Sequence, residues 1–302
     1  MIALIDLYEK ELLKVNGFAP STVETYLISV KAFCEYAAGE LNKRIDRIKG
    51  PDLMQWLQVV KQTGIGQTRL EHHHYALKSF FAFLEKSGHV RKNPAGAMPL
   101  MIIRRRNRTK PISTSDAYTL LASFDKSAWH SLRNYTMVSL LWGLGLRTAE
   151  LTGLTVNSFR TGHGKRTGLL RIRGKNKKQR ALFVVDRLFD CLMAYLSHPE
   201  SPKKKTSPLF PAQPGKAISN NRLRRLVKDQ AKAAGVKPDV TPRVLRHSFA
   251  TEMYHQNVPL SAIQAMMGHE SKAETSIYVH VSDKLKELAL DAIFISGRLS
   301  WE

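Results

Sequence analysis

The chain has 302 residues, a length that favours two domains, each able to bury a core. Its 43% apolar and 24% charged residues are typical of a globular protein, but 47 Lys and Arg against 25 Asp and Glu give a net charge of +22. This imbalance predicts a polyanionic partner, and it favours nucleic acid over a ribosome-associated or merely soluble basic protein. Cys34 and Cys191 lie too far apart in the sequence to suggest a disulfide framework or a zinc site.

The N-terminal residues do not have the form of a targeting segment. Asp6, Glu9 and Glu11 interrupt the stretch where a signal peptide needs apolar residues. No window approaches the roughly 18 apolar residues of a membrane span. We therefore expect no membrane contact and a place in the bacterial cytoplasm, in association with the nucleoid.

Residues 1–95 are predicted to form a small helical bundle. After Ser21, apolar residues recur with a period of about 3.6, and Ser21 with Glu24 has the form of a capping box. Further helices are expected over residues 52–60 and 67–88. In the last of these, His72, His73 and His74 point about 100° apart and cannot converge on one metal ion. A DNA-facing helix, with His73 as the candidate contact, and a plain solvated face are both open.

Residues 96–112 are predicted to be a basic linker punctuated by prolines. Such a run is either a solvated segment or a strap across a phosphate backbone. In the second case the candidate DNA contacts are Arg104, Arg105, Arg106 and Arg108. Residues 1–95 hold 13 Lys and Arg and 10 Asp and Glu, so most of the excess charge follows them. Binding to nucleic acid should therefore depend mainly on residues 96–302 and weaken steeply with salt.

Residues 113–302 are predicted to be a second domain that begins with helices, one of them over residues 132–144. A hairpin follows, with strands over residues 169–173 and 181–185 and a Gly/Asn turn between them. Helices are expected from there to the end, one of them over residues 244–255 with Arg246 near its start.

A turn between two helices is predicted at residues 268–271. Ile263, Met266 and Met267 lie on one helix face, and Gly268 is a natural residue to end that helix. Ser271 and Glu274 have the form of a capping box for the next helix. His269 would then lie in the turn, and Tyr278 about two turns into the second helix.

Each of these residues has an ordinary alternative when it is taken alone: a core or surface aromatic, a solvated arginine, a histidine bonded to its own backbone. Together they resemble the motifs of the tyrosine recombinase (phage integrase) family, and most closely those of its compact two-domain Xer-type members. The family has an Arg followed by Glu, a hairpin Lys, an Arg, a Gly-His pair and a Tyr nine residues later. In this chain the matching residues are Arg147, Glu150, Lys175, Arg246, His269 and Tyr278.

The resemblance implies a mainly α-helical fold with a small β-sheet or hairpin in the catalytic domain, and two domains that form a C-shaped clamp on DNA. It also implies the chemistry. Tyr278 would attack a phosphodiester to give a 3′-phosphotyrosyl link, and Lys175 would protonate the leaving 5′-oxygen. Arg147 and Arg246 would bind the non-bridging oxygens.

The same resemblance assigns supporting roles to two further residues. His269 would bond the phosphate or assist proton transfer, and Glu150 would orient the arginines. Lys177 lies close enough to Lys175 that the identity of the acid stays open, and Lys177 is kept as a DNA contact. Neither cofactor nor metal is implied, because the arginines supply the charge that Mg²⁺ supplies elsewhere.

The chain departs from the family at Arg243, which stands where most members have the first His of a His-x-x-Arg motif. Arg243 can still donate to a phosphate oxygen, but it cannot titrate as histidine does. His247 is displaced by four positions and should point elsewhere. Three alternatives to a recombinase are therefore weighed: a catalytically impaired DNA-binding or architectural protein of the same fold, a type IB topoisomerase-like enzyme, and a metal-dependent nuclease.

The expected partner is double-stranded DNA, with Arg222 and Arg225 as further candidate backbone contacts. By the family resemblance, four protomers would assemble on two DNA sites, as a homotetramer or with a partner recombinase. Sequence specificity depends on a few side chains that reach base edges and on DNA deformability. The charge pattern therefore predicts affinity for DNA rather than a target sequence.

Overall fold

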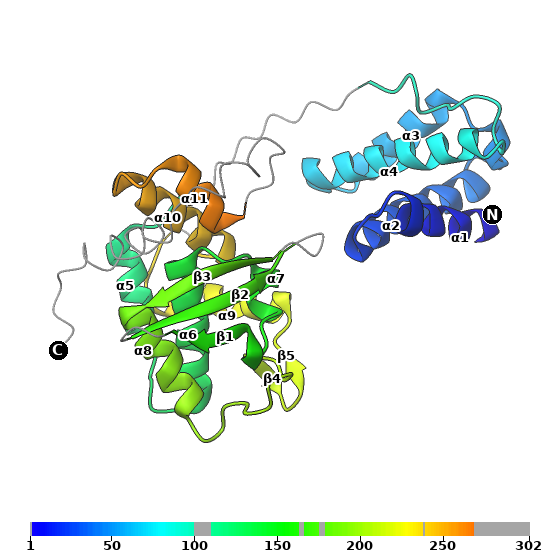
Figure 1. Ribbon diagram of the computed structural model, residues 1–302. Coiled ribbons are helices and arrows are strands. Elements are labelled where there is room, and N and C mark those ends of the chain that lie inside the picture. Colours follow the sequence, from blue (N-terminus) through cyan, green and yellow to red (C-terminus); the bar gives the residue numbers. More distant parts are fainter. Residues whose placement is uncertain (1, 100–109, 163–165, 175–178, 238, 269–302) are drawn as a thin grey trace. The chain divides into compact units, whose positions relative to one another are not determined.

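The computed structural model describes residues 2–99, 110–162, 166–174, 179–237 and 239–268 (Figure 1). The chain divides into two compact units, Met1–Asn107 and Arg108–Glu302. Each unit has its own cluster of buried apolar side chains. Among the described residues, no helix combines the length and apolar character that crossing a membrane requires.

The first unit is helical, as predicted. Its elements are α1 (Ile2–Lys10), a π-helical turn (Glu11–Val15), α2 (Pro20–Gly39), a 3-10 turn (Ile45–Arg47), α3 (Gly50–Gln62) and α4 (Gln67–Lys86). Helices α2 and α4 pack along each other, with α1 against α2 and α3 against α4. Edge-on aromatic contacts in the core join these helices: Phe33 of α2 meets Trp56 of α3 and Phe81 of α4.

Two predictions for the first unit are wrong. The Ser21–Glu24 capping box does not form, because α2 begins at Pro20 with Ala19 as an extended N-cap and no side-chain cap bond. Proline at a first helical position presets the backbone angle, so the helix begins before Ser21. The solvated or DNA-facing interpretation also fails for His74, which is 1% exposed. Residues 70, 74, 77 and 81 share one face of α4, and that face packs into the core.

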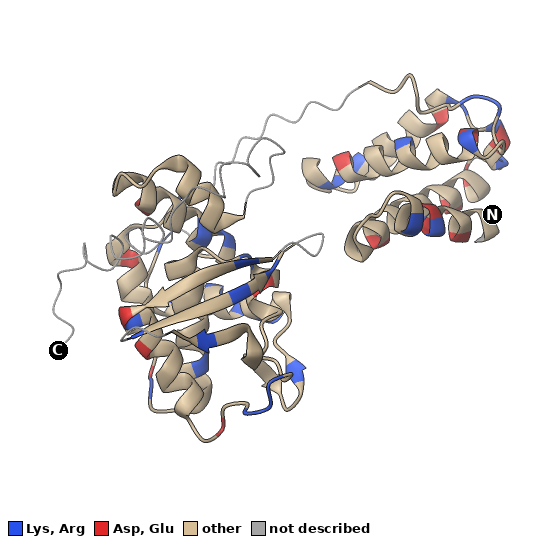
Figure 2. Cartoon of the chain, viewed as in Figure 1, with Lys and Arg blue, Asp and Glu red and all other residues tan. Residues whose placement is uncertain are grey.

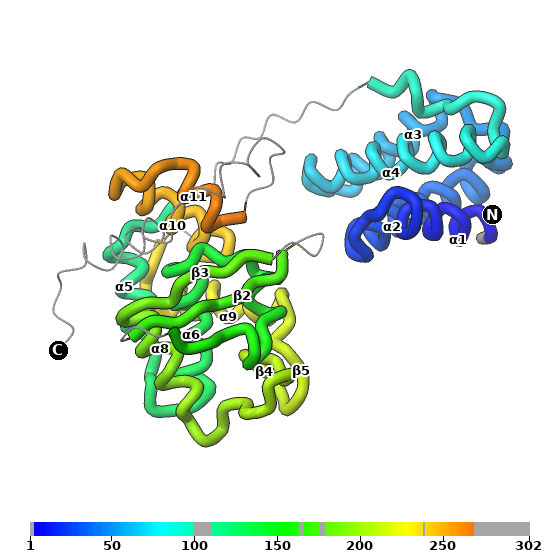
Figure 3. The backbone as a smooth tube through the Cα atoms, viewed as in Figure 1, coloured from blue at the N-terminus to red at the C-terminus, as the bar shows by residue number. Residues whose placement is uncertain are grey.

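The second unit surrounds a small antiparallel sheet with helices. Its elements are α5 (Thr114–Ala122), α6 (Trp129–Leu144), α7 (Thr148–Thr152), a 3-10 turn (Val156–Ser158), β1 (Phe159–Thr161), β2 (Thr167–Arg173), β3 (Gln179–Val185), α8 (Asp186–Ser197), β4 (Pro211–Gln213), β5 (Lys216–Ala217), α9 (Asn220–Ala233), α10 (Pro242–His255) and α11 (Leu260–Met267). Helix α6 packs against α8 and α10, and α8 packs against β2 and β3 (Figure 3).

The sheet has the order β1-β2-β3 and one covered face. Leu170 pairs with Leu182 and Ile172 pairs with Arg180. The two strands alternate in burial, so Leu170, Ile172, Leu182 and Val184 face the core while Arg171 and Arg173 face out. Because Arg180 shares the inward face with Leu182, its side chain enters the unit near the end of the sheet.

The predicted hairpin and the helices around it are confirmed. The structure extends the hairpin strands by a few residues and adds β1, which is too short to show an alternating pattern. The prediction of helices alone after the hairpin is wrong in one place, since β4 and β5 pair between α8 and α9. Helix α10 begins at Pro242, with the Thr241 hydroxyl accepting from the Val244 amide. Helix α11 ends at a left-handed Gly268, as predicted.

Candidate active site

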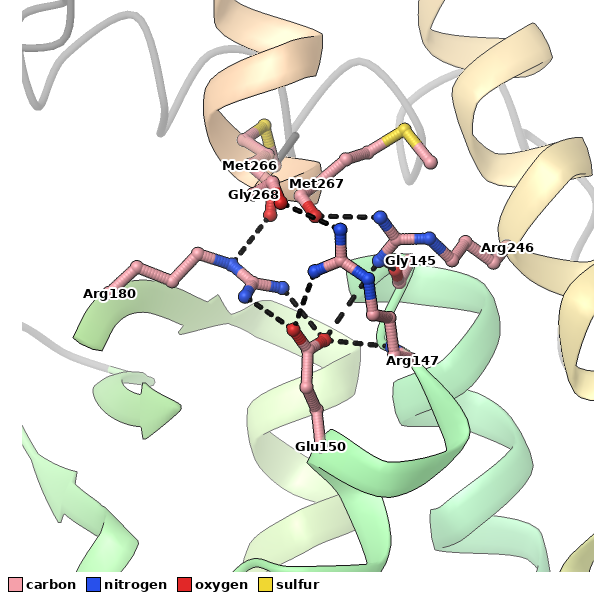
Figure 4. Close-up of polar contacts among 8 residues, drawn as sticks. All are labelled: Gly145, Arg147, Glu150, Arg180, Arg246, Met266, Met267 and Gly268. Carbon is pink, nitrogen blue, oxygen red and sulfur yellow. Dashed lines mark hydrogen bonds and ion pairs between the residues drawn. The ribbon is translucent and has the colours of Figure 1, made fainter. Parts of the chain in front are cut away.

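The C-terminal turn of α11 is held by three arginines from three different parts of the second unit (Figure 4). Arg180 donates from Nε to the Met266 carbonyl at 2.9 Å, and Arg246 donates from Nη2 to the Met267 carbonyl at 2.6 Å. Arg147 donates from Nη2 to the Gly268 carbonyl at 2.7 Å. The last carbonyls of a helix lack intrahelical partners and carry partial negative charge, so guanidinium groups are their natural donors.

Glu150 is the carboxylate on which these arginines converge. Its Oε2 accepts from the Arg147 backbone amide at 2.8 Å, and its Oε1 accepts from Arg147 Nη1 at 2.9 Å. Arg180 binds both oxygens, with Nη1 2.7 Å from Oε1 and Nη2 2.9 Å from Oε2. Arg246 Nη1 is 3.9 Å from Oε2. Since α7 is short and begins just after Arg147, its first turn places Glu150 directly beneath that side chain.

The electrostatics of this cluster favour a bound anion. Three guanidinium groups surround one carboxylate whose side chain is 3% exposed. Burial opposes ionisation of Glu150, but the hydrogen bonds and charges of Arg180 and Arg147 outweigh it and lower the carboxyl pKa. Burial and the neighbouring Arg147 lower the pKa of Arg246 to about 10, so it stays charged at neutral pH. The positive charge exceeds the negative, and the excess is available to a ligand.

Arg147 is the most accessible of the three arginines. Its side chain is 42% exposed, against 16% for Arg180 and 11% for Arg246. Of the five N–H donors of each guanidinium, Arg147 and Arg246 each use two within the cluster. Both side chains therefore keep donors for an anion that approaches the exposed side.

Two glycines shape the site. Gly145 ends α6 in a left-handed conformation with φ 59°, and its carbonyl accepts from Arg246 Nη1 at 2.5 Å. A Cβ at Gly145 would lie 2.5 Å from the ring of Phe249, so α6 and α10 can approach this closely only with glycine there. Gly268 has φ 60°, and a Cβ there would lie 2.9 Å from Arg180 Nη1.

The match to family models covers both units. The model of the phage integrase family matches residues 110–284, and that of the phage integrase N-terminal SAM-like domain matches residues 5–88. The chain belongs to the phage integrase family. The first of these matches contains the whole arginine cluster, so the geometry above lies in the part that defines the family.

Curated relatives of this phage integrase family member include tyrosine recombinases. One from Thermosipho africanus is 29% identical over 293 residues, which are 95% of this chain and 98% of the relative. A tyrosine recombinase XerC from Thermodesulfovibrio yellowstonii is 33% identical over 214 residues, 69% of each chain. The post-cleavage complex of XerH site-specific recombinase with a palindromic difH substrate shares the fold, with a TM-score of 0.69, 23% identity and coverage of 94% of this chain and 84% of that one.

The structure brings together three of the sequence-predicted catalytic residues of this phage integrase: Arg147, Glu150 and Arg246. Arg243 lies one turn before Arg246 on α10 and is exposed, as is His247. The catalytic candidates Lys175, His269 and Tyr278 lie outside the described residues. So do the DNA-contact candidates Lys177, Arg104, Arg105, Arg106 and Arg108.

The described DNA-contact candidates lie apart from the arginine cluster. Arg222 and Arg225 are exposed on α9, whose apolar side is buried (Figure 2). His73 is half-buried and meets the Trp56 ring edge-on, so a DNA contact by His73 stays a prediction. Across the described parts of the chain, no group of three or more His, Cys, Asp or Glu side chains is placed as metal ligands would be.

Arg180 is the residue that sequence reasoning missed in this phage integrase. It forms the bidentate contact with Glu150, yet it lies in a strand identified only by its apolar residues. One signal was present. Strand alternation puts Arg180 on the same face as Leu182 and Val184, and an arginine on a core face requires a buried acceptor.

Proposed function

We propose that this chain is a site-specific DNA recombinase that cleaves and rejoins strands through a 3′-phosphotyrosyl intermediate. One observation carries the proposal: Arg147 and Arg246 are held on adjacent carbonyls at the end of α11, with donors to spare. That end immediately precedes His269, and Tyr278 follows in the sequence. Two guanidinium groups can bind the two non-bridging oxygens of a phosphodiester and stabilise the charge that develops there.

The proposed reaction conserves the phosphodiester bond energy. The Tyr278 phenol oxygen bonds to phosphorus, the bond from phosphorus to the 5′-oxygen breaks, and Lys175 gives that oxygen a proton. Attack by another 5′-hydroxyl reverses these steps on a new strand, so no nucleotide cofactor is consumed. A free tyrosine has a pKa of about 10, so nearby positive charge from the arginines and His269 would assist its deprotonation.

Arg243 is proposed to be a third phosphate donor rather than an acid or base. It is exposed and lies on the same helix as Arg246, one turn earlier. A guanidinium keeps its charge throughout the working pH range. This position would therefore supply electrostatic stabilisation without titration.

The partner is proposed to be double-stranded DNA, bound by both units, with residues 96–112 as a basic linker between domains 1–95 and 113–302. The exposed basic face of α9 supports a phosphate contact by Arg222 and Arg225. Assembly as a tetramer on two sites, and a place in the bacterial cytoplasm at the nucleoid, are further parts of this proposal.

The test is covalent capture on DNA. Nicked duplexes would be made from DNA flanking the gene and from sequences selected for binding to the purified chain, and they would be incubated with it in EDTA without ATP. We expect a complex that survives denaturing electrophoresis with the wild type and is absent with Tyr278→Phe. Strand cleavage that leaves no protein attached, or an equal yield from Tyr278→Phe, would contradict the proposal.

A further inference from the structure

Arg180 joins three segments that are far apart in the sequence. It extends from the first turn of β3, donates two hydrogen bonds to Glu150 of α7 and donates a third to the Met266 carbonyl of α11. Figure 4 shows it reaching Glu150 from the side opposite Arg246. At 16% exposure it is nearly enclosed, and Gly268 lies against its guanidinium. The contact is thus built into the fold rather than formed by a side chain on the surface.

The groups that Arg180 holds are the groups that hold Arg147. Glu150 receives the backbone amide and Nη1 of Arg147, and the Gly268 carbonyl receives its Nη2. The Met267 carbonyl, one residue after the Arg180 acceptor, receives Arg246. Any shift of Glu150 or of the last turn of α11 therefore moves the acceptors of both phosphate-binding arginines.

A guanidinium is the only side chain that can make this set of bonds. Its planar fork binds the two oxygens of one carboxylate, while Nε points along the third direction to a carbonyl. Lysine offers a single ammonium centre and cannot bridge both acceptors in the same geometry.

We infer that Arg180 is a positioning residue that holds Glu150 and the end of α11 as one unit, so that Arg147 and Arg246 face the scissile phosphate. The inference rests on the proposed recombinase function. Arg180 itself turns inward and need not touch DNA. Its removal should reduce the rate of the chemical step more than it reduces DNA affinity.

The experiment compares Arg180→Met and Arg180→Lys with a matched control, Arg166→Met. Arg166 also forks onto a carboxylate, that of Asp190, but this pair is exposed. It lies at the opposite end of the seven-residue β2, roughly 20 Å away at about 3.3 Å per residue. Covalent-complex formation would be measured in single turnover at saturating protein, on the nicked duplex that the wild type cleaves. Duplex affinity would be measured separately.

We expect Arg180→Met to lower the single-turnover rate by about 100-fold, because a misplacement near 1 Å costs roughly that much. Arg180→Lys should lose about 10-fold, since it keeps the charge but not the fork. DNA affinity should change less than about 3-fold, and Arg166→Met should match the wild type in both measurements. A rate for either Arg180 variant equal to that of Arg166→Met, or a loss that disappears as protein is raised to saturation, would overturn the inference.

A pH profile gives a readout that a merely structural role would not move. Arg180 supports the ionised form of Glu150, so Arg180→Met should shift the acid limb of the rate profile to higher pH while Arg166→Met leaves it in place. An unshifted acid limb in a folded Arg180→Met protein would count against positioning through Glu150. If Arg180→Met does not fold, Arg180→Lys decides. Failure of both to fold would overturn the inference, because Arg180 would then be required for the fold itself.

Failure of the proposed function would look different. In that case the wild type forms no covalent complex. The acid dependence of thermal unfolding, measured without DNA, then still tests whether Arg180 controls Glu150. With a wild type that cleaves, normal cleavage by Arg180→Met counts only against Arg180.

Discussion

Replacing Gly268 with alanine perturbs the arginine cluster through a single added methyl group. Gly268 has φ 60°, and its Cβ would lie 2.9 Å from Nη1 and 3.1 Å from Cζ of Arg180. Gly235, which follows α9, is a matched control, because it is also left-handed with φ 72° and a Cβ there would meet nothing within 4 Å. Comparing the two alanine variants removes the backbone cost that they share.

The expected magnitude follows from these contacts. A non-glycine residue in the left-handed region costs about 1 kcal/mol, which both variants lose. At Gly268 the methyl group also displaces Arg180, whose bonds to Glu150 are charge-assisted and contribute about 1.5–3 kcal/mol each. Partial weakening of these bonds gives a free energy of unfolding lower by about 2–4 kcal/mol for Gly268→Ala, against about 1 kcal/mol for Gly235→Ala.

Equilibrium unfolding in urea measures this difference. In a Trp56→Phe background the remaining tryptophans belong to the second unit, so fluorescence follows that unit. The comparison would be repeated with Arg180→Met, where the penalty of Gly268→Ala should fall to that of Gly235→Ala because the displaced bonds are absent. Two results would refute the reasoning: equal penalties for the two glycines while Arg180 is present, or a Gly268→Ala penalty that Arg180→Met leaves unchanged.

Three further substitutions test other parts of the account. Glu150→Gln should lower the free energy of unfolding by about 3–5 kcal/mol at neutral pH, as expected when a buried ion pair loses one charge, and calorimetry should show the gap narrowing as pH falls below about 4.5, where Glu150 becomes protonated. Burial lowers the pKa of His74, so stability of the first unit should decline as pH falls below about 6.5, and His74→Leu should flatten that decline in acid unfolding, whereas the exposed His72→Leu should not. Arg243→His should give the cleavage rate a new pH dependence near about 6.5 that the wild type lacks.

Each of these expectations has a contrary result. A constant gap between Glu150→Gln and the wild type across acid pH would show that the carboxylate charge does not stabilise the cluster. Equal acid sensitivity of His74→Leu and the wild type would place the responsible proton elsewhere. A pH–rate profile of Arg243→His that superimposes on that of the wild type would separate position 243 from the reacting phosphate.

The main elements of the fold could be predicted because their signals are local. An apolar helical period marks α10 and α11, alternation marks β2 and β3, and Gly268 marks a helix end. Elements without a local period could not be predicted. Strand β1 has three residues, and β4 and β5 are shorter than the window that an alternating pattern needs.

The candidate site divides in the same way. Arg147, Glu150 and Arg246 stand in motifs that resemble a known family, so the residues could be chosen from the sequence. Their acceptors could not, because the carbonyls of Gly145, Met267 and Gly268 become partners only when α6 and α11 meet. A backbone carbonyl leaves no trace in residue identity. His74 failed for a related reason, since one histidine of three was buried by its position on the helix rather than by its chemistry.

The most direct test of the central claim is to identify the bond between protein and DNA. A covalent complex trapped on a nicked duplex would be digested with protease and nuclease, and the nucleotide-bearing peptide would be sequenced by mass spectrometry. The account predicts one peptide, linked through Tyr278 to a 3′-phosphate, and a released strand that a kinase labels directly at its 5′-hydroxyl. Linkage through another residue, or a released strand that carries a 5′-phosphate, would contradict it.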